Sequence, residues 1–464
     1  MIPDEWGRGE IAVVGLGKSG LAASRLLTRE GFHVYASDGG GGHSPVVEAD
    51  VAALRAAGVS VDVGSHDLER IARASLVVVS PGVPPDAAPL ARARAAGVPV
   101  VSEIEIGLRF LSPSTRYVAV TGTNGKTTTT AMVGHLLRAL GHSAIDAGNI
   151  GTPLAEVALA ELPPSWVALE LSSFQLHDTP GIAPDVGVLT NLSPDHLDRY
   201  ASVREYYADK ELLFRNANAE SKWVVNDADD ASVDMIARVM GHHFHFGKSP
   251  LADMTYQPAD ATGPGWIAYR GHHILERDEL PLLGDHNVEN AMAAALAVIV
   301  ADEQHASEDA LSRIAEGLRS FRALPHRLEN VGEWDGVMWI NDSKATNVSS
   351  TLVALNAMKR PAIVLLGGRH KGEPYTALAN PLRRIGKAVI AYGEAAPIVE
   401  HDLAGAAPMH RLGSDFDEVM ALARSIAGPG DVVLLSPACS SYDMFENYVQ
   451  RGEEFSRIAR GDHR

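Results

Sequence analysis

The strongest local signal in the sequence is Thr121-Gly122-Thr123-Asn124-Gly125-Lys126-Thr127-Thr128. It follows a short apolar segment at residues 117–120 and precedes residues 129–140, which we expect to be helical. A glycine-rich turn between a strand and a helix presents backbone amides to phosphate oxygens. The stretch therefore predicts a phosphate loop in which Lys126 neutralises charge and the Thr127 hydroxyl ligates Mg²⁺, although the usual spacing would place another glycine at Val120.

A carboxylate is expected close to this loop. A Mg²⁺ ion held by Thr127 needs an acidic ligand, and Glu170 stands near the end of an apolar segment, residues 166–171. A carboxylate in so apolar a strand is hard to explain by structure alone, because burying an unpaired charge is costly. Glu170 is therefore the predicted acidic ligand.

Short apolar segments alternate with Ala- and Leu-rich segments along all 464 residues, a rhythm typical of βα units around parallel sheets. At about 150 residues per domain, this length predicts roughly three domains. We predict an α/β protein with three domains in series. They are a Rossmann-like domain at 1–112, a central P-loop ATPase-type domain with a parallel or mixed sheet at 113–323, and a second Rossmann-like domain at 324–464. The expected strands are 11–14, 33–37, 76–79, 117–120, 166–171, 186–190, 223–226, 337–341, 362–366, 388–392 and 432–435.

A second glycine motif, Gly15-Leu16-Gly17-Lys18-Ser19-Gly20, follows the first expected strand and opens a helical segment. Asp38 closes the next strand, where an acid commonly binds a ribose hydroxyl, and Ser80-Pro81-Gly82 forms another loop at the same sheet edge. The motif predicts a bound nucleotide diphosphate, but glycines that serve only strand–helix packing are the alternative.

Bulk composition limits the partners and the location of the chain. The formal charge of −18 argues against nucleic-acid polymers and anionic membranes, which both need a basic face. The single cysteine, Cys439, cannot form an internal disulfide, as expected in a reducing compartment. We expect no signal peptide, because residues 1–6 lack a basic start and an apolar run, and no apolar stretch approaches membrane-spanning length. We expect a cytoplasmic monomer without membrane insertion.

Several readings of these residues remain open. An oxidoreductase with a nicotinamide cofactor would explain the first glycine motif, but it leaves Lys126 and Glu170 without a purpose. A regulatory module would bind ATP without turnover. His196 and Lys210 are candidates for the metal cluster, yet a lone His or Lys normally faces solvent.

Taken together, these segments resemble the Mur ligases of bacterial cell-wall synthesis over essentially the whole chain. The marks shared with that family are residues 122–128, Asn191 with Asp195-His196, and His286-Asn287 with Asn290. Further segments resemble the members that add D-glutamate. They are residues 170–176, 341–347 and 436–441, together with Asp443 and Phe445.

The resemblance implies an ATP-dependent amide ligase that adds D-glutamate to UDP-N-acetylmuramoyl-L-alanine through an acyl phosphate, in peptidoglycan precursor synthesis. It implies two Mg²⁺ sites and a carbamylated Lys210, because carbamylation turns a cation into an anion that can ligate metal. A sister ligase for another amino acid, or a ligase similar to folylpolyglutamate synthase, is the alternative. The folate enzymes should lack the N-terminal glycine motif that this chain has.

The resemblance also implies a role for each of the following residues. The catalytic residues would be Lys126, Glu170, His196 and Lys210, and the metal ligands Thr127, Glu170, His196 and Lys210. ATP would contact Gly122, Thr123, Asn124, Gly125, Lys126, Thr127, Thr128, Asn287, Asn290, His326, Arg327 and Asp342. The UDP substrate would contact Gly15, Gly17, Lys18, Ser19, Asp38, Ser80, Gly82, Asn149, Gln175 and His196. D-Glutamate would contact Thr346, Lys371, Ser441 and Tyr448.

Overall fold

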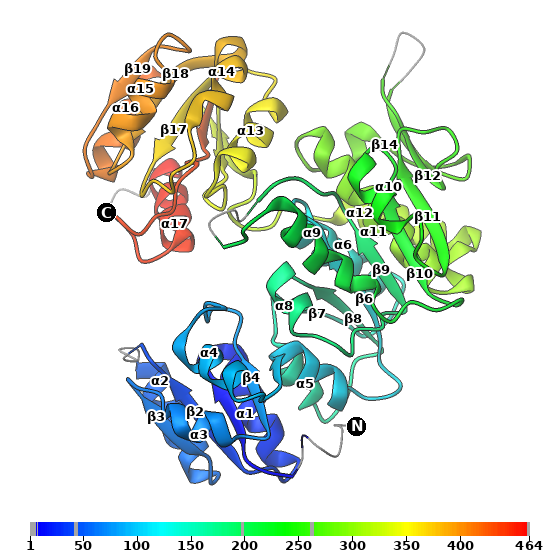
Figure 1. Cartoon of the computed structure of the whole chain (residues 1–464). Coiled ribbons are helices and arrows are strands. Elements are labelled where there is room, and N and C mark those ends of the chain that lie inside the picture. Colours follow the sequence, from blue (N-terminus) through cyan, green and yellow to red (C-terminus); the bar gives the residue numbers. More distant parts are fainter. Residues whose placement is uncertain (1–5, 7, 41–44, 196–198, 260–263, 462–464) are drawn as a thin grey trace. The chain divides into compact units, whose positions relative to one another are not determined.

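The computed structural model in Figure 1 describes residues 6, 8–40, 45–195, 199–259 and 264–461. Within these residues the chain forms three sheets of five, nine and six strands. The predicted three-domain α/β architecture with parallel and mixed sheets is confirmed. The chain divides into two compact units, residues 1–277 with 289–319, and residues 278–288 with 320–464. The first unit holds the five- and nine-stranded sheets, and the second holds the six-stranded sheet.

The five-stranded sheet is parallel, with the order β3-β2-β1-β4-β5. Its strands are β1 (Ile11–Val14), β2 (Val34–Asp38), β3 (Ser60–Val63), β4 (Leu76–Val79) and β5 (Val100–Ser102). Its helices are α1 (Lys18–Arg29), α2 (Pro45–Ala56), α3 (Leu68–Arg73), α4 (Ala88–Ala95) and α5 (Glu103–Phe110). Strands β1 and β4 are buried along their whole length, because apolar clusters cover both faces of the sheet. The strand order reverses between β1 and β4, and such a switch point is where these folds bind ligands.

The nine-stranded sheet has the order β14-β13-β12-β11-β10-β9-β6-β8-β7. Its strands are β6 (Arg116–Thr121), β7 (Ala144–Gly148), β8 (Trp166–Glu170), β9 (Val186–Leu189), β10 (Lys222–Asn226), β11 (His242–Gly247), β12 (Met254–Gln257), β13 (Trp266–Tyr269) and β14 (His272–Glu276). The pairings among β6 to β12 are parallel, and β12 to β14 form an antiparallel extension. Strand β6 lies between β8 and β9, so the carboxyl ends of these three strands meet at one edge of the sheet.

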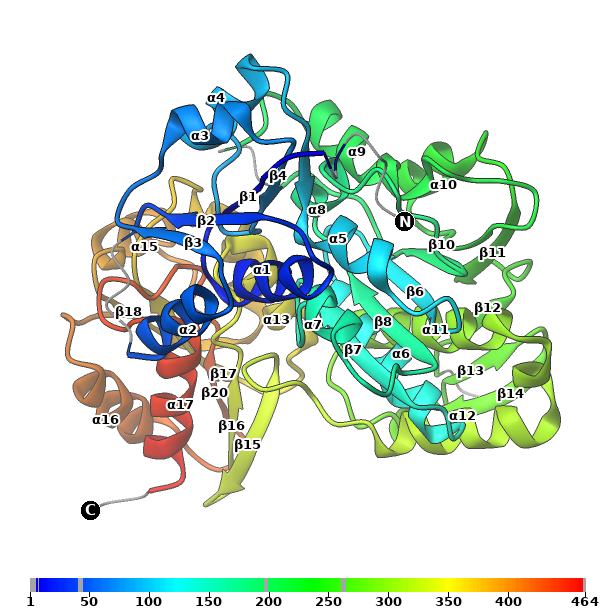
Figure 2. The same cartoon turned by 90° about the horizontal axis from the view of Figure 1, so that it is seen from below.

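The helices of this part begin with α6 (Lys126–Ala139), which directly follows β6. The others are α7 (Leu154–Ala158), α8 (Ser173–His177), α9 (Val203–Glu211), η1 (Leu212–Phe214), α10 (Asp230–Ile236), η2 (Arg277–Glu279), α11 (Asp285–Ala301), η3 (Glu303–Ala306) and α12 (Glu308–Ser320). Helix α7 packs against α1 and α5, which joins the first two sheets within one unit (Figure 2).

The six-stranded sheet has the order β15-β16-β20-β17-β18-β19, and only β15 runs antiparallel to its neighbour. Its strands are β15 (Glu329–Trp334), β16 (Val337–Asn341), β17 (Ala362–Gly367), β18 (Gly386–Tyr392), β19 (Met409–Arg411) and β20 (Val432–Leu435). Its helices are α13 (Val348–Ala357), η4 (Tyr375–Leu378), α14 (Ala379–Ile385), α15 (Ala396–Asp402), α16 (Phe416–Ile426) and α17 (Tyr448–Ala459). Two apolar clusters fill the space between the sheet and these helices.

All eleven expected strands are present, and their ends shift by no more than two residues. The structure adds the short strands β3, β5, β7, β12, β13, β14, β15 and β19, and it contains β11 where the sequence alternates at residues 242–246. The predicted divisions at residues 112/113 and 323/324 stay a prediction. Among the helices that the structure describes, none is long and apolar enough to cross a membrane.

Candidate active site

The loop between β6 and α6 has backbone conformations that require glycine. Gly122 has a φ of +141° and Gly125 a φ of +82°. Side chains are strained in this left-handed region, whereas glycine enters it freely. A Cβ atom would also overlap the Thr190 hydroxyl at position 122 and the Asn290 side chain at position 125. The loop can therefore approach its neighbours, and α6 begins directly after it at Lys126.

The segment that follows β9 holds the loop in place. The Thr123 amide donates to the Asn191 carbonyl at 2.8 Å, and the Asn124 amide donates to Asn191 Oδ1 at 3.0 Å. The Thr190 hydroxyl donates to the Asn124 carbonyl at 2.6 Å. These bonds fix the loop before any ligand binds, and such preorganisation is what electrostatic stabilisation of a reacting phosphate needs.

The Lys126 ammonium lies over the loop from which α6 starts. Its Nζ donates to the carbonyls of Gly122 at 2.9 Å and of Thr123 at 2.7 Å. Thr127 and Thr128 follow in the first turn of α6. The positive charge and the start of the helix thus lie at the same place, and both attract a phosphate.

Glu170 stands at the end of β8, in register with Val120 of β6. The residue is only 1% exposed. Its Oε1 accepts a hydrogen bond from Asn149 Nδ2 at 2.7 Å, whereas its Oε2 is buried and has no partner among the described residues. An unpaired buried carboxylate oxygen calls for an explanation, and a cation ligated at this oxygen supplies one.

Lys210 lies on α9 and is 1% exposed. Its Nζ donates to the Gly122 carbonyl at 2.7 Å, so the amine reaches the phosphate loop. Burial holds the pKa of Lys210 well below its usual range, and repulsion by Lys126 acts in the same direction. His196, the other predicted ligand, lies outside the described residues. In the part of the chain that the structure describes, no three His, Cys, Asp or Glu side chains gather as a metal site.

The first glycine motif forms a loop closed by Asp38. The carboxylate accepts hydrogen bonds from the amides of Leu16 at 2.7 Å and Gly40 at 2.9 Å. It retains acceptor capacity for a ribose hydroxyl, because an ionised carboxylate has about four lone-pair sites. Gly15 has a φ of +91°, and its carbonyl accepts from the Ser80 hydroxyl at 2.8 Å.

A cavity of about 600 Å³ lies at this sheet edge. Its walls include eight of the ten residues predicted for the UDP substrate, namely Gly15, Gly17, Lys18, Ser19, Asp38, Ser80, Gly82 and Asn149. Gln175 lines a neighbouring cavity of about 210 Å³, which shares Ser80, Pro81 and Val83 with the first. His66 also lines the larger cavity, and its Nδ1 lies 2.9 Å from the Ser37 hydroxyl. No sequence pattern indicates a role for His66, which is a single histidine in a loop.

The residues predicted around the nucleotide fall in both units. Asn290 belongs to the first unit, where its Oδ1 accepts from the Thr129 hydroxyl at 3.3 Å. Asn287, His326, Arg327 and Asp342 belong to the second. Asp342 is buried and accepts from the Leu328 amide at 3.2 Å and the Ser436 hydroxyl at 2.8 Å. Burial raises its pKa to about 7.

The residues predicted for D-glutamate all lie in the second unit, at Thr346, Lys371, Ser441 and Tyr448. Lys371 is exposed, in the segment after β17, whereas Ser441 is 2% exposed. The ammonium of Lys344 lies 3.9 Å from the centroid of the Tyr448 ring, a cation–π contact. We did not predict a role for Lys344 from the sequence, although the residue belongs to the 341–347 segment.

Comparisons with known proteins identify the family of the chain. Three family descriptions match the chain: "Mur ligase MurD-like, N-terminal domain" at residues 9–102, "Mur ligase middle domain" at 120–298, and "Mur ligase, glutamate ligase domain" at 326–439. The chain belongs to the Mur ligase family.

Two relatives carry the name UDP-N-acetylmuramoylalanine--D-glutamate ligase. The protein of Salinibacter ruber is 41% identical over 99% of both chains, and that of Anaeromyxobacter dehalogenans is 42% identical over 97% of both. Among solved structures, the UDP-N-acetylmuramate-alanine ligase MurC of Thermotoga maritima has a TM-score of 0.63. It is 21% identical, with 98% of this chain and 100% of that chain covered, so it shows the shared fold.

Proposed function

We propose that the chain is an ATP-dependent ligase that joins D-glutamate to the carboxylate of UDP-N-acetylmuramoyl-L-alanine, in the synthesis of peptidoglycan precursors. One observation carries the proposal. The buried carboxylate of Glu170, with an unpaired oxygen, stands on the strand beside the one that leads into the Lys126 loop. Relatives named for this reaction match the chain over its whole length.

The reaction needs two bond exchanges. A carboxylate does not react with an amine at neutral pH, because oxide is too poor a leaving group. A carboxylate oxygen of the substrate bonds to the γ-phosphorus of ATP while the bond to ADP breaks. The amine of D-glutamate then bonds to the resulting acyl carbon, phosphate leaves with its electron pair, and the amine loses a proton.

In both reaction steps, negative charge develops on phosphate oxygens. Lys126, whose ammonium lies over the loop, and the amides of the 122–128 loop would stabilise that charge. We assign one Mg²⁺ ion to Thr127 and Glu170 and a second to His196 and the carbamate of Lys210, where the bound ions would neutralise phosphate oxygens and polarise the P–O bonds. The unpaired Oε2 of Glu170 supports this assignment.

Lys210 fits this site as a carbamate. The lone pair of an uncharged amine bonds to the carbon of CO₂, and loss of one amine proton leaves a carbamate anion. Lys210 is buried and feels the positive charge of Lys126, and both disfavour an ammonium ion at this position. A carbamate would place an anion beside Lys126 and supply a further oxygen ligand.

The remaining substrate groups are assigned to the loops already described. The cavity at Gly15, Asp38 and Ser80 would take the UDP group, with Asn149 and Gln175 at the sugar. The nucleotide would contact Asn287, Asn290, His326, Arg327 and Asp342, and D-glutamate would contact Thr346, Lys371, Ser441 and Tyr448. Lys371 suits an amino acid with two carboxylates to neutralise. We place the reaction in the cytoplasm and propose that the enzyme acts as a monomer.

A phosphate-release assay with UDP-N-acetylmuramoyl-L-alanine and a panel of D- and L-amino acids tests the proposal. We expect ATP-dependent release with D-glutamate and little release with L-glutamate or L-lysine. Equal or faster release with another amino acid would make the chain a sister ligase. Release that requires a folate substrate would reassign it to the folate enzymes, which the N-terminal cavity argues against.

A further inference from the structure

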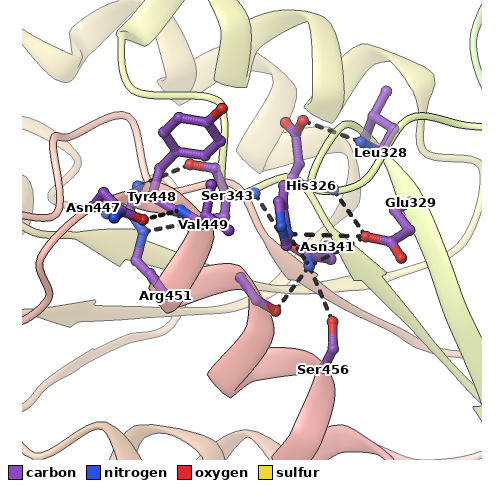
Figure 3. A network of polar contacts seen from close by, with 12 residues as sticks. His326, Leu328, Glu329, Asn341, Ser343, Asn447, Tyr448, Val449, Arg451 and Ser456 are labelled. Carbon is purple, nitrogen blue, oxygen red and sulfur yellow. Dashed lines mark hydrogen bonds and ion pairs between the residues drawn. The ribbon is translucent and has the colours of Figure 1, made fainter. Parts of the chain in front are cut away.

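A polar network in the second unit centres on Asn341, which ends β16 and is fully buried (Figure 3). Its Oδ1 accepts from the Ser343 amide at 3.1 Å, and its Nδ2 donates to the Gly452 carbonyl at 2.9 Å. A backbone N–H can only donate and a carbonyl can only accept. The side-chain amide of Asn341 therefore has one permitted orientation, which these two backbone groups determine.

The same Nδ2 faces the imidazole of His326, 3.0 Å from Nδ1 (Figure 3). The Asn341 NH₂ group has no acceptor capacity, so Nδ1 has to accept and cannot carry a proton. Nδ2 carries only two hydrogens, which the Gly452 carbonyl and His326 Nδ1 share with the Ser456 hydroxyl at 3.0 Å and Glu329 Oε2 at 3.4 Å. Glu329 Oε2 lies 4.0 Å from His326 Nδ1, too far to take a proton from it through a hydrogen bond.

The backbone and a glycine hold the ring against Asn341. His326 has a φ of +63°, which is unusual for a residue with a side chain, and its amide donates to Glu329 Oε2 at 2.8 Å. A Cβ atom at Gly452 would overlap His326 Nδ1. Glycine is unfavourable inside a helix such as α17, and the close approach of the ring explains its presence there. The strained backbone of His326 and the glycine at position 452 therefore both allow the His326 ring to contact Asn341.

We propose that Asn341 is a positioning residue that fixes His326 as the neutral tautomer with its proton on Nε2, so that Nε2 donates to an oxygen of the bound nucleotide. This role rests on the proposed function, which places His326 at the nucleotide. Among the described residues Nε2 has no partner, and 11% of the side-chain surface remains exposed. Burial is the largest influence on the pKa of His326 and lowers it, and it outweighs the opposing effects of Glu329, Glu453 and Asn341, so the neutral ring is favoured at neutral pH.

The tautomer can be read directly in the unmodified protein. In the full chain labelled with ¹⁵N-histidine, long-range ¹H–¹⁵N correlation spectra distinguish a protonated ring nitrogen from an unprotonated one. The His326 signals would be assigned by their loss in His326→Gln and by contacts to the Tyr448 ring, whose centroid lies 6.2 Å away. At pH 7.5 we expect Nδ1 to be unprotonated and Nε2 protonated. A proton on Nδ1 would overturn the proposal.

Asn341→Asp inverts the contact while keeping the shape of the side chain. A carboxylate at this position accepts, so the His326 proton should move to Nδ1 and the midpoint of its titration should rise. The KM for ATP should increase about tenfold or more, because the loss of one hydrogen bond to a charged group is of that size, while the KM for D-glutamate changes little. Ser456→Ala is the matched control, since it removes another neighbour of Nδ2 and should keep the wild-type tautomer.

An unchanged tautomer in a folded Asn341→Asp protein would refute the positioning role. A changed tautomer with an unchanged KM for ATP would refute the link to the nucleotide. If Asn341→Asp does not fold, the spectrum of the unmodified protein still decides the tautomer. Absence of ligase activity in the unmodified protein would remove the proposed function but leave the tautomer result standing.

Discussion

The side-chain amide of Asn149 donates to Glu170 Oε1 at 2.7 Å, and this contact orients the carboxylate so that Oε2 stays unpaired. The backbone amide of Asn149 also donates to the Glu170 carbonyl at 3.0 Å. Asn149 also lines the cavity beside Gly15 and Asp38, so a single residue belongs to the expected sugar-nucleotide site and contacts the expected metal ligand. We therefore expect binding of the carboxylate substrate and placement of the metal to depend on each other through Asn149.

Glu170→Gln should remove catalysis without harming the fold. The glutamine oxygen can still accept the hydrogen bond from Asn149. Its NH₂ group, which cannot ligate a metal, then lies where we assign the cation. We expect kcat to fall by about 100-fold or more and the Mg²⁺ requirement to rise. Thermal stability should be equal or higher, because a buried charge with an unpaired oxygen is lost.

The matched control for this substitution is Glu156→Gln, at an exposed position on α7. It should leave kcat and the Mg²⁺ titration unchanged. Turnover of Glu170→Gln within a few-fold of the unmodified protein would show that Glu170 is not a metal ligand.

Lys126→Ala should abolish substrate-dependent ADP release while the protein stays folded. The loss should be about 1000-fold, because the ammonium stabilises charge that develops in the transition state. Circular dichroism and thermal unfolding check the fold, and Lys359→Ala, at an exposed position, is the control for loss of a surface charge. Full turnover by folded Lys126→Ala protein would contradict the phosphate-loop assignment.

Lys210→Ala tests the carbamate. Activity should fall at least about 100-fold, and added formate or acetate should restore part of it by supplying an anion in the vacated space. Lys210→Arg should be equally inactive and should show no restoration, since the guanidinium fills the space with a cation that cannot be carbamylated. Wild-type activity of Lys210→Ala without added anions would eliminate the carbamate.

Much of the fold was predictable because its central strands carry a strong local pattern. Strands β1, β4 and β20 are continuous apolar runs buried along their whole length, and their observed bounds are the predicted ones. The strands missing from the expected list are short or lie toward the sheet edges. Strands β13 and β14 have four and five residues, and the outer one is exposed at three of its five positions. A pattern so short does not distinguish a strand from a loop.

The part of the site that is formed by consecutive residues could be predicted from the sequence. The residues of the 122–128 loop are consecutive, and their chemistry is evident from their order. The contacts that hold the site are not local, since Asn191 supports Asn124 across 67 positions and Asn341 meets Gly452 across 111. No sequence pattern indicates that the two residues of either pair lie in contact. The structure was needed to find these contacts and to find the unpaired oxygen of Glu170.

Glu103→Gln should change the pH dependence of stability. Glu103 is 1% exposed, its Oε1 accepts from the Ala155 amide at 2.6 Å, and burial raises its pKa to about 7. In the unfolded chain the pKa is about 4.3, so between these values the folded protein binds more protons than the unfolded chain. The contribution of Glu103 to stability therefore falls as the pH rises from about 4 to about 7.

The glutamine variant lacks this titration and retains an oxygen for the Ala155 amide. Its stability relative to the unmodified protein should rise with pH, by on the order of 2 kcal/mol between pH 5 and pH 8. Urea unfolding at several pH values measures this difference, with Glu156→Gln as the exposed control. A difference that does not vary with pH would mean that Glu103 titrates normally in the folded protein.

The most direct test of the account follows the oxygen atoms. UDP-N-acetylmuramoyl-L-alanine labelled with ¹⁸O in its carboxylate is converted with ATP and D-glutamate, and the released phosphate is analysed by mass spectrometry. If a carboxylate oxygen attacks the γ-phosphorus, one labelled oxygen leaves with the phosphate and the other remains in the amide. Unlabelled phosphate from a reaction that forms the amide would contradict the acyl-phosphate mechanism.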